Sequence, residues 1–182
     1  TFDSSGSVEI MYDFGSAVAG FQFDVTGLSG LSAAGGAAAD AGFGIDAGAT
    51  TVIGFSMTGA EIAAGSGVLT VLSFASISDG MSTLSLGNSG AITAASSTEF
   101  NSTVAGSIDH GTADCAGVYY GTSVLSGCDN ACNSTATLDD CNVCDDDSAN
   151  DNSTCTQDCD MVWGGTATLD NCNTCDSDAM NN

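Results

Sequence analysis

The stretch Ser7-Val-Glu-Ile-Met-Tyr-Asp-Phe14 decides the fold class, because large apolar side chains return at every second position. Val8, Ile10 and Tyr12 fall on one face of an extended chain, and this period of two is typical of a strand with one buried face. The same alternation returns at residues 19–25, where Phe and Val alternate with Gln and Asp. The sequence therefore predicts β-strands at the start of the chain.

Further strands are expected along the first 109 residues, separated by turn signals such as Thr26-Gly27 and Asp79-Gly80. The candidates are residues 51–57, 67–74 and 82–86, with weaker patterns at 91–93 and 103–108. A helical turn is indicated only at residues 60–64. Many short strands with regular turns favour an all-β sandwich or jelly roll.

The composition is strongly acidic. The 182 residues include 23 Asp and Glu, one His and no Lys, Arg or Pro, for a formal charge of −23. The carboxylates must therefore face water, accept hydrogen bonds or bind cations. Nucleic acids and anionic lipids are poor partners, because both are bound through Lys and Arg. The most apolar uncharged stretch, residues 62–78, is interrupted by Gly and Ser and predicts a strand, so no membrane insertion is expected.

The chain has two regions that are expected to be stabilised in different ways. Residues 1–109 carry the strand patterns, whereas all nine cysteines lie in residues 110–182. The first region is expected to bury an apolar core. The second has too little apolar sequence for a core and is expected to be an irregular tail held by disulfides.

Three motifs of the first region occur in a recognisable order. Val18-Ala-Gly-Phe-Gln-Phe-Asp-Val-Thr-Gly27 is followed by Thr50-Thr-Val-Ile-Gly-Phe-Ser56 and by Gly59-Ala-Glu-Ile-Ala-Ala-Gly65. This order resembles the cohesin-like β-sandwich modules of secreted bacterial proteins, although Ala63 stands where that family usually has Pro. The resemblance implies a jelly-roll fold. Cohesins of cellulosomes bind dockerins, but no binding residue of the family can be matched in this sequence.

The cysteine-rich region is internally repetitive. Thr135-Ala-Thr-Leu-Asp-Asp-Cys-Asn-Val-Cys-Asp145 matches Thr166-Ala-Thr-Leu-Asp-Asn-Cys-Asn-Thr-Cys-Asp176. In an ungapped alignment one copy of the repeat has all four of its cysteines, Cys128, Cys132, Cys141 and Cys144. The other two copies have Tyr119 and Trp163 at the position of Cys132. A gapped alignment, which matches Cys128 and Cys132 to Cys155 and Cys159, is the alternative. Both resemble the Cys/Asp-rich repeats of secreted, multi-module microbial proteins.

The two Cys-x-x-Cys pairs fit zinc or disulfides, and we favour disulfides because the surroundings are rich in Asp and further cysteines. In the ungapped alignment the first copy lacks the cysteines that correspond to Cys132 and Cys144, and cysteines that are absent together are expected to be bonded together. This predicts the disulfides Cys115–Cys128, Cys132–Cys144 and Cys159–Cys172. The neighbouring cysteines that remain give Cys141–Cys155. Cys175 is then left for an intermolecular bond, a role that the gapped alignment moves to Cys115. A disulfide-rich chain of this kind is expected outside the cell or on its surface.

Glycans and calcium are the other expected attachments. Asn101, Asn133 and Asn152 each begin an Asn-x-Ser/Thr sequon and are candidate glycosylation sites. Carboxylates crowd one part of the tail and predict calcium as a cofactor, the candidate ligands being Asp139, Asp140, Asp145, Asp146, Asp147 and Asp151. No Asp-x-Asp-x-Asp-Gly loop is present, so a solvated acidic face with loosely held ions is the alternative.

No catalytic residue is predicted. His110 is the only histidine and is expected to be a linker residue, and nothing selects a pair of carboxylates for acid–base chemistry. The chain is therefore expected to be a non-enzymatic, extracellular structural protein, a subunit of a surface fibre in which copies of the chain join head to tail. The alternative is a cohesin-like module that binds protein or carbohydrate within a larger secreted protein.

Overall fold

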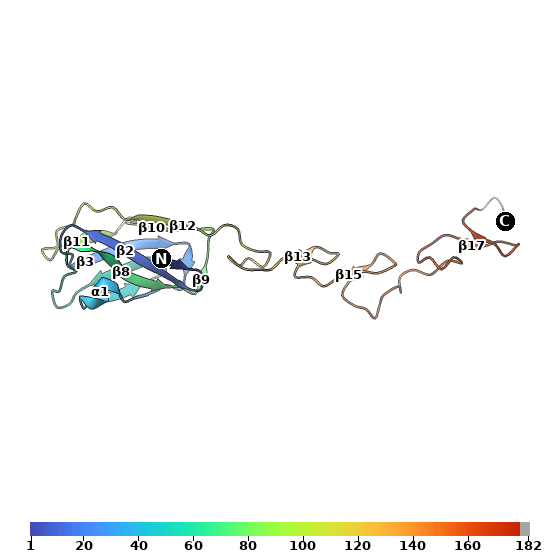
Figure 1. Cartoon of the computed structure of the whole chain (residues 1–182), viewed down its shortest axis with the longest axis horizontal. Coiled ribbons are helices and arrows are strands. Elements are labelled where there is room, and N and C mark those ends of the chain that lie inside the picture. Colours follow the sequence, from blue (N-terminus) through green and yellow to red (C-terminus); the bar gives the residue numbers. More distant parts are fainter. Residues whose placement is uncertain (179–182) are drawn as a thin grey trace. The chain divides into compact units, whose positions relative to one another are not determined.

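The computed structural model describes residues 1–178 and divides the chain into two compact units (Figure 1). The first unit contains residues 1–113 together with 117–121, and the second contains residues 114–116 and those from 122 onward. About 40% of the chain is strand and 3% is helix. The prediction of an all-β protein is confirmed.

Twelve strands and one short helix are described in the first unit. They are β1 (Phe2–Asp3), β2 (Ser7–Phe14), β3 (Gly20–Thr26), β4 (Leu28–Ser29), β5 (Ser32–Ala34), α1 (Gly36–Asp40), β6 (Gly44–Ala47), β7 (Thr51–Phe55), β8 (Gly65–Ser73), β9 (Ser76–Ile77), β10 (Met81–Ser85), β11 (Ala91–Thr93) and β12 (Ala105–Asp109).

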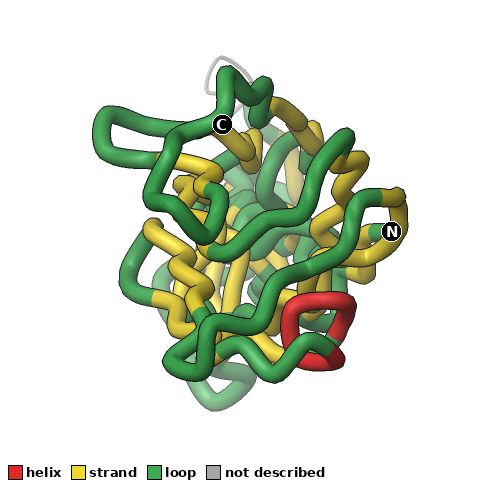
Figure 2. The backbone as a smooth tube through the Cα atoms, turned by 90° about the vertical axis from the view of Figure 1, so that its left-hand side faces the viewer, coloured by secondary structure: helices red, strands yellow, loops and turns green. Residues whose placement is uncertain are grey.

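These strands form two main sheets, and every pairing within residues 1–178 is antiparallel (Figure 2). One sheet has the order β1-β2-β8-β5, and the other has the order β12-β10-β3-β7-β6, with β11 also paired to β3. Strand β2 lies along β8 over its whole length, with one irregularity in register between Ile10 and Met11. The order of each sheet departs from the chain order, so the connections cross between sheets.

A single apolar core lies between the two sheets, because each contributes its alternate, inward side chains. Phe23, Val52 and Leu72 are 2% exposed or less. The buried set is Val8, Ile10, Val18, Phe21, Phe23, Val25, Leu28, Ala38, Phe43, Val52, Ile62, Leu69, Leu72, Phe74 and Ile92. The alternation seen in the sequence of residues 7–14 and 19–25 is therefore the alternation between core and solvent.

The helical turn expected at residues 60–64 is wrong. Ile62 instead makes an isolated antiparallel bridge with Val18, with main-chain hydrogen bonds of 2.9 and 2.8 Å in the two directions. Ile62 is 2% exposed, so core packing and this bridge override the weak helical preference of the neighbouring alanines.

The second unit consists of three small hairpins without an extended core. Its strands are β13 (Leu125–Ser126), β14 (Ala131–Cys132), β15 (Thr137–Leu138), β16 (Cys144–Asp145), β17 (Thr168–Leu169) and β18 (Cys175–Asp176), each odd-numbered strand pairing with the next. Of the described hydrophobic side chains here, only Ala136 is buried. Covalent bonds therefore do the work that a core does in the first unit.

Four disulfides hold this unit: Cys115–Cys132, Cys128–Cys144, Cys141–Cys155 and Cys159–Cys175. Only Cys141–Cys155 agrees with the expected pairing. The expected bonds Cys115–Cys128, Cys132–Cys144 and Cys159–Cys172 are wrong. Cys175, expected to be left over, is bonded to Cys159, and the free cysteine is the exposed Cys172.

Hydrogen bonds around β15 explain the difference in pairing. The Cys128 N–H donates to the Ala136 carbonyl (3.1 Å), and Cys144 lies opposite Leu138 in the hairpin. Both cysteines are thereby held against the same short strand, whereas Cys141 lies in the turn and reaches the loop that follows. The assumption that cysteines lost together are bonded together does not hold for this repeat.

Four disulfides suggest an oxidising, extracellular environment. Among residues 1–178 the structure contains no helix with the length and apolar character needed to span a membrane.

Candidate functional site

The outer edge of strand β2 is only partly covered. Strand β1 pairs with its first two residues, where Phe2 lies opposite Val8 and Asp3 opposite Ser7, and the Glu9 N–H then donates to the Thr1 carbonyl (2.8 Å). Beyond Glu9, the described residues place no strand beside residues 10–14 on this edge. Alternate residues of a strand direct their N–H and C=O groups to the same edge, so Met11 and Asp13 have main-chain groups available there for another strand.

The edge of the second sheet is open as well. Strand β12 pairs with β10 on one side and with no other strand in residues 1–178. The four residues before it, 101–104, make no main-chain hydrogen bonds among themselves or to other described main-chain groups. The core therefore opens along a line bounded by β2 on one side and by residues 101–109 on the other.

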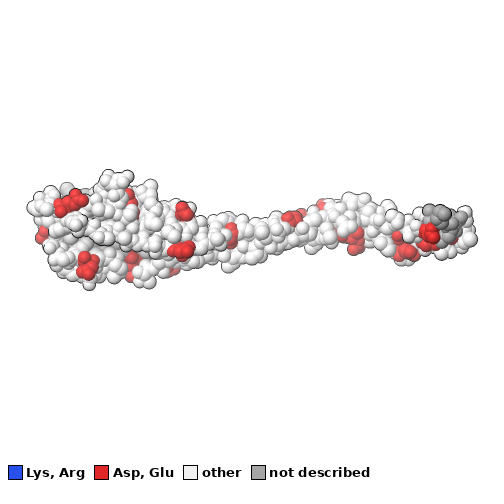
Figure 3. Space-filling model, turned by 90° about the horizontal axis from the view of Figure 1, so that it is seen from above, with Lys and Arg blue, Asp and Glu red and all other residues white. Residues whose placement is uncertain are grey.

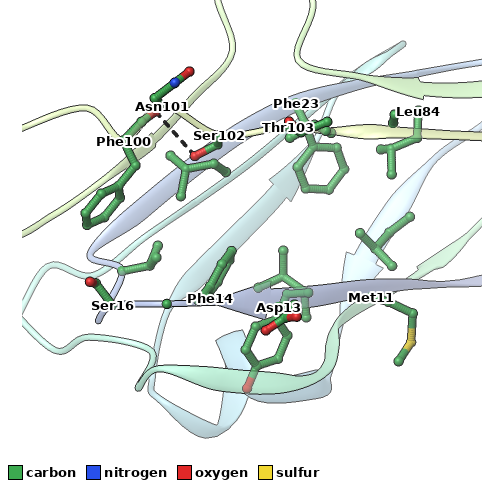
Figure 4. Close-up of a pocket in the computed structure, with 18 residues that line it drawn as sticks. Met11, Asp13, Phe14, Ser16, Phe23, Leu84, Phe100, Asn101, Ser102 and Thr103 are labelled. Atoms are coloured by element: carbon green, nitrogen blue, oxygen red, sulfur yellow. Dashed lines mark hydrogen bonds between the residues drawn. The ribbon is translucent and has the colours of Figure 1, made fainter.

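A groove occupies this opening, and it consists of two adjoining clefts. The larger measures about 530 Å³ and lies between the last residues of β2 and residues 100–105 (Figure 4). The smaller measures about 260 Å³ and lies between the first half of β2 and strand β12. Ile10, Met11, Leu84 and Ala105 line both clefts, which makes them one continuous surface.

The floor of the groove is apolar and aromatic. Tyr12 and Phe14 are half-buried, and their ring centroids lie 4.7 Å apart. Figure 4 shows Phe14 and Phe23 directed into the larger cleft. Val104 reaches it from the opposite wall. Inward side chains of β2 become less covered toward its end, since Val8 is 8% exposed and Ile10 7%, whereas Tyr12 and Phe14 are not fully buried.

The groove carries few charges. Its ionisable carboxylates are Asp13 in the larger cleft and Glu9 in the smaller. Glu9 accepts a hydrogen bond from the Thr1 hydroxyl and lies 3.1 Å from the Thr1 amino group. These contacts, the hydroxyl first and the ammonium second, hold the pKa of Glu9 below its usual range. The rest of the lining is neutral, so the groove favours an uncharged occupant.

Open strand edges above an apolar floor suit an extended polypeptide. An added strand satisfies the main-chain N–H and C=O groups of the edge, and its alternate side chains enter the cleft. The sequence patterns located β2 and β12 but did not reveal this groove. Whether an edge is covered depends on which strands pair, and the local alternation carries no signal for that.

The expected glycosylation sites have different surroundings. Asn101 is exposed on the rim of the groove, and its side chain points away from the cleft (Figure 4). The Asn133 amide donates to the Ser123 hydroxyl (3.0 Å), and the Asn152 amide donates to the Asp140 carboxylate (3.3 Å). A glycan replaces one of the two N–H groups of the amide, so at Asn133 and Asn152 it must leave the hydrogen-bonded N–H in place, a constraint that the described residues do not impose on Asn101.

His110 is not the linker residue that was expected. Its ring is buried, 4% of the residue being exposed, with Nε2 2.7 Å from the Ser82 hydroxyl and Nδ1 3.1 Å from the Tyr120 hydroxyl. The ring also packs against Phe2 and Tyr119. Ser82 is 4% exposed, so this Ser–His contact is closed to a substrate and acts in packing.

The candidate calcium ligands are occupied by the chain itself in several cases. Asp139 accepts hydrogen bonds from the Val143 and Asn152 N–H groups, and these lower its pKa, with the Asn152 bond the larger cause. Asp145 and Asp147 accept from the main-chain N–H two residues ahead, at 3.0 Å each. Within residues 1–178 no group of three His, Cys, Asp or Glu side chains is arranged to hold a metal ion. Calcium remains a prediction.

The acidic side chains have a clear structural role instead. Main-chain N–H groups donate to the carboxylates of Asp3, Asp109, Asp114, Asp129, Asp139, Asp145, Asp147, Asp158, Asp170 and Asp176. Such bonds fix turns where no sheet or helix pairs the backbone. Figure 3 shows carboxylates scattered over the visible face with no cationic side chain beside them.

Comparison with protein-family models, with curated proteins and with solved structures finds no match to this chain.

Proposed function

We propose that this protein is an extracellular structural subunit of a surface fibre, in which the groove of one copy accepts an extended segment of the next. The observation that carries the proposal is the open line between β2 and residues 101–109, where two strand edges flank an apolar floor. Strand addition joins copies in one direction only, because donor and acceptor surfaces differ, and such contacts form open chains when the rotation between copies does not close a ring.

A second copy is the occupant that the charges favour. The groove is nearly neutral, and residues 116–127 of the chain form an uncharged run. Within that run Val118, Tyr120, Val124 and Leu125 are each more than half exposed. A run with several exposed apolar side chains and no carboxylate can cover the apolar floor of the groove without adding negative charge. We assign residues 122–127 of this run, which lie outside the first unit, as the donor.

The two-sheet architecture of the first unit supports the cohesin-like interpretation. We assign the first unit to the jelly-roll, cohesin-like sandwiches, since it has two antiparallel sheets around one core. The motif at residues 18–27 forms β3, and the motif at residues 50–56 forms β7, which pairs with β3. These motifs therefore lie in the middle of one sheet, and Val18, Phe23 and Val25 of the first motif line the groove.

The formal charge of −23 sets the conditions under which such a fibre forms. Copies of this chain repel one another at low ionic strength, and salt reduces that repulsion. Because the groove itself is nearly neutral, salt mainly weakens the repulsion between two approaching copies and changes the contacts between their joined strand edges little. Fibres are thus expected in saline, oxidising surroundings.

Electron microscopy of a proline variant tests the proposal. The Glu9 N–H points to the open edge of β2, so the Met11 N–H, two residues on, points the same way. Met11→Pro removes this donor at an edge where proline is tolerated, and Met11→Ala keeps it. We expect filaments from the parent and Met11→Ala chains and separate particles from Met11→Pro, all with the same far-ultraviolet circular dichroism. Filaments of equal length from Met11→Pro would contradict strand addition at this edge.

The same experiment addresses the alternative of a binding module in a larger secreted protein. The groove's two carboxylates, Glu9 and Asp13, could form ion pairs with Lys or Arg of a bound strand. A second copy of this chain cannot form such pairs, because it has no Lys or Arg. Separate particles from the parent chain at every salt concentration, together with capture of such a basic strand, would favour that alternative.

A further inference from the structure

We propose that the free chain holds its own donor segment in an inhibited state, in which Asn133 binds residues 123–124 and keeps them from the groove of another copy. The inference rests on the proposed function, because it concerns the same donor, residues 122–127, and the same partner, a second copy of the chain. It adds a contact that limits how fast copies join. All the residues that carry it belong to the second unit.

Strand addition requires open main-chain groups along one edge of the donor. In an extended segment the N–H and C=O groups of alternate residues point to the same edge. Those of Val124 therefore point to one edge, and those of Ser123 and Leu125 point to the other. The donor can pair along its length only when one of these two edges is open.

The edge that contains Val124 is closed by Asn133. The Asn133 N–H donates to the Val124 carbonyl (2.8 Å), and the Val124 N–H donates to the side-chain oxygen Oδ1 of Asn133 (3.2 Å). Farther along the same edge, Ser126 lies opposite Ala131 in the hairpin of β13 and β14. Both main-chain groups of Val124 are thus bound within the chain.

The opposite edge is closed at Ser123. The Ser123 N–H donates to the Oδ2 atom of the Asp114 carboxylate (2.9 Å), and the Ser123 hydroxyl accepts from the side-chain nitrogen Nδ2 of Asn133 (3.0 Å). Residues 123–124 are therefore held on both edges. They must leave Asp114 and Asn133 before they can pair with β2 of another copy.

An unusual backbone conformation places Asn133 for these contacts. Its φ is 55°, in the left-handed region that asparagine tolerates better than most residues. In a regular antiparallel pair a main-chain carbonyl would accept from the Val124 N–H, but here the side-chain Oδ1 does so. Part of the inhibiting contact is therefore made by a side chain, which a substitution can remove without changing the path of the chain.

The held segment keeps its apolar side chains exposed. Val124 is 63% exposed and Leu125 is 56% exposed. Their burial in the apolar groove of another copy would be favourable and would offset the loss of the hydrogen bonds. Because exposed groups exchange such bonds for bonds to water at little net cost, the Asn133 contact delays release and does not prevent it.

Release of the segment breaks no disulfide, because the inhibiting contacts are hydrogen bonds. Residues 122–127 lie inside the loop closed by Cys115–Cys132, and Cys128 follows them directly. The released donor is therefore a loop that stays tied to the second unit at both ends. A copy that donates it remains covalently continuous with its own first unit.

Asn133→Gly tests the contact with little change to the backbone. Glycine adopts a φ of 55° without strain and keeps the N–H that donates to Val124, but it lacks both Oδ1 and Nδ2. Asn130→Gly is the matched control, because Asn130 is also exposed and has a φ of 52°. Its side chain makes no hydrogen bond within residues 1–178. Neither variant changes the charge, and neither residue lines the groove.

Two measurements on the full chain follow from the proposal. We expect hydrogen exchange at the Val124 amide, followed by nuclear magnetic resonance, to be about tenfold faster in Asn133→Gly than in the parent. Elongation from parent filament seeds in saline should be faster by the same factor, because its rate follows the fraction of chains whose donor is released. Asn130→Gly should match the parent in both.

The outcomes separate this proposal from the proposed function. Equal exchange at Val124 in the parent and in Asn133→Gly would show that the Asn133 side chain does not hold the segment, and would overturn the inhibition. Filaments that elongate at equal rates would overturn the inhibition alone. Filaments from Asn133→Gly but not from the parent would support it. If none of the chains forms filaments at any salt concentration, the proposed function fails and the inhibition fails with it.

Discussion

The Nε2 atom of His110 lies 2.7 Å from the hydroxyl oxygen of Ser82, and each residue is 4% exposed. His110 adjoins strand β12 and Ser82 belongs to β10, and these strands are neighbours in one sheet. Because Nδ1 contacts the Tyr120 hydroxyl, both ring nitrogens have partners. The only histidine of the chain thereby fixes residues 117–121 to the first unit.

Removing the Ser82 hydroxyl should leave a buried ring nitrogen without a partner. We expect Ser82→Ala to lower the free energy of unfolding by about 1–3 kcal/mol, the usual cost of an unsatisfied buried polar group. Ser85→Ala, at an exposed position of the same strand, is the matched control and should change it little. Urea unfolding followed by circular dichroism measures both, and equal effects would show that the His110 contact is not stabilising.

Gly54 tests how closely the two central strands pack. A Cβ atom on Gly54 would lie 2.2–2.7 Å from atoms of the Phe21 ring, which is 2% exposed and cannot move into solvent. We expect Gly54→Ala to destabilise the first unit by about 1–3 kcal/mol through overpacking. Gly44→Ala in the adjacent strand meets no atom closer than 3.8 Å and should be neutral. Thermal unfolding of the two variants distinguishes overpacking from a general effect of replacing glycine.

Asp139 predicts a pH dependence in the second unit. Hydrogen bonds from the Asn152 and Val143 N–H groups lower the pKa of Asp139 below 3.8. The stabilisation is therefore present above pH 3.8 and is lost as the pH falls through the lower, folded value. We expect the amide resonances of Asn152 and Val143 to shift together below pH 3.8 in nuclear magnetic resonance spectra. Asp139→Asn should abolish this shift, and its persistence would assign the titration to another carboxylate.

The calcium prediction is open to a direct measurement. Asp146 and Asp151 are candidate ligands with no hydrogen bond to the described residues, so their oxygens are available to cations. If calcium binds specifically, the melting midpoint should rise with calcium and not with sodium chloride of equal ionic strength. An unchanged midpoint would leave only loosely held ions.

The strands that pack large side chains were predictable from sequence. Residues 7–14 are strand β2 as expected, and the pattern at 19–25 differs from β3 by one residue at each end. Strand β5, Ser32–Ala34, was missed because its small side chains show no alternation of apolar and polar character. The helix at Gly36–Asp40 was missed because its flanking glycines indicate a turn.

The candidate site was less predictable, since it depends on contacts between distant segments. The alternation at residues 7–14 indicates a buried face, but not that the segment Thr1–Asp3 covers the edge of β2 only as far as Glu9 and leaves the rest uncovered. The burial of His110 follows from Phe2 and Tyr120, which are far from one another in sequence. The prediction of the cysteine pairing was wrong for a similar reason, because Cys128 and Cys144 meet through main-chain contacts with the neighbouring residues Ala136 and Leu138, which spacing alone does not reveal.

The disulfides of the second unit overlap along the chain. Cys128 lies inside the loop closed by Cys115–Cys132, and Cys141 lies inside the loop closed by Cys128–Cys144. A protease that cuts one peptide bond between Cys115 and Cys155 therefore leaves both ends covalently joined. No bridge among the described residues spans residues 156–158, which separate Cys155 from Cys159. Between Cys115 and Cys175, therefore, this short stretch is where a pulling force is carried by the main chain alone and where a single cut separates the two disulfide-bonded parts.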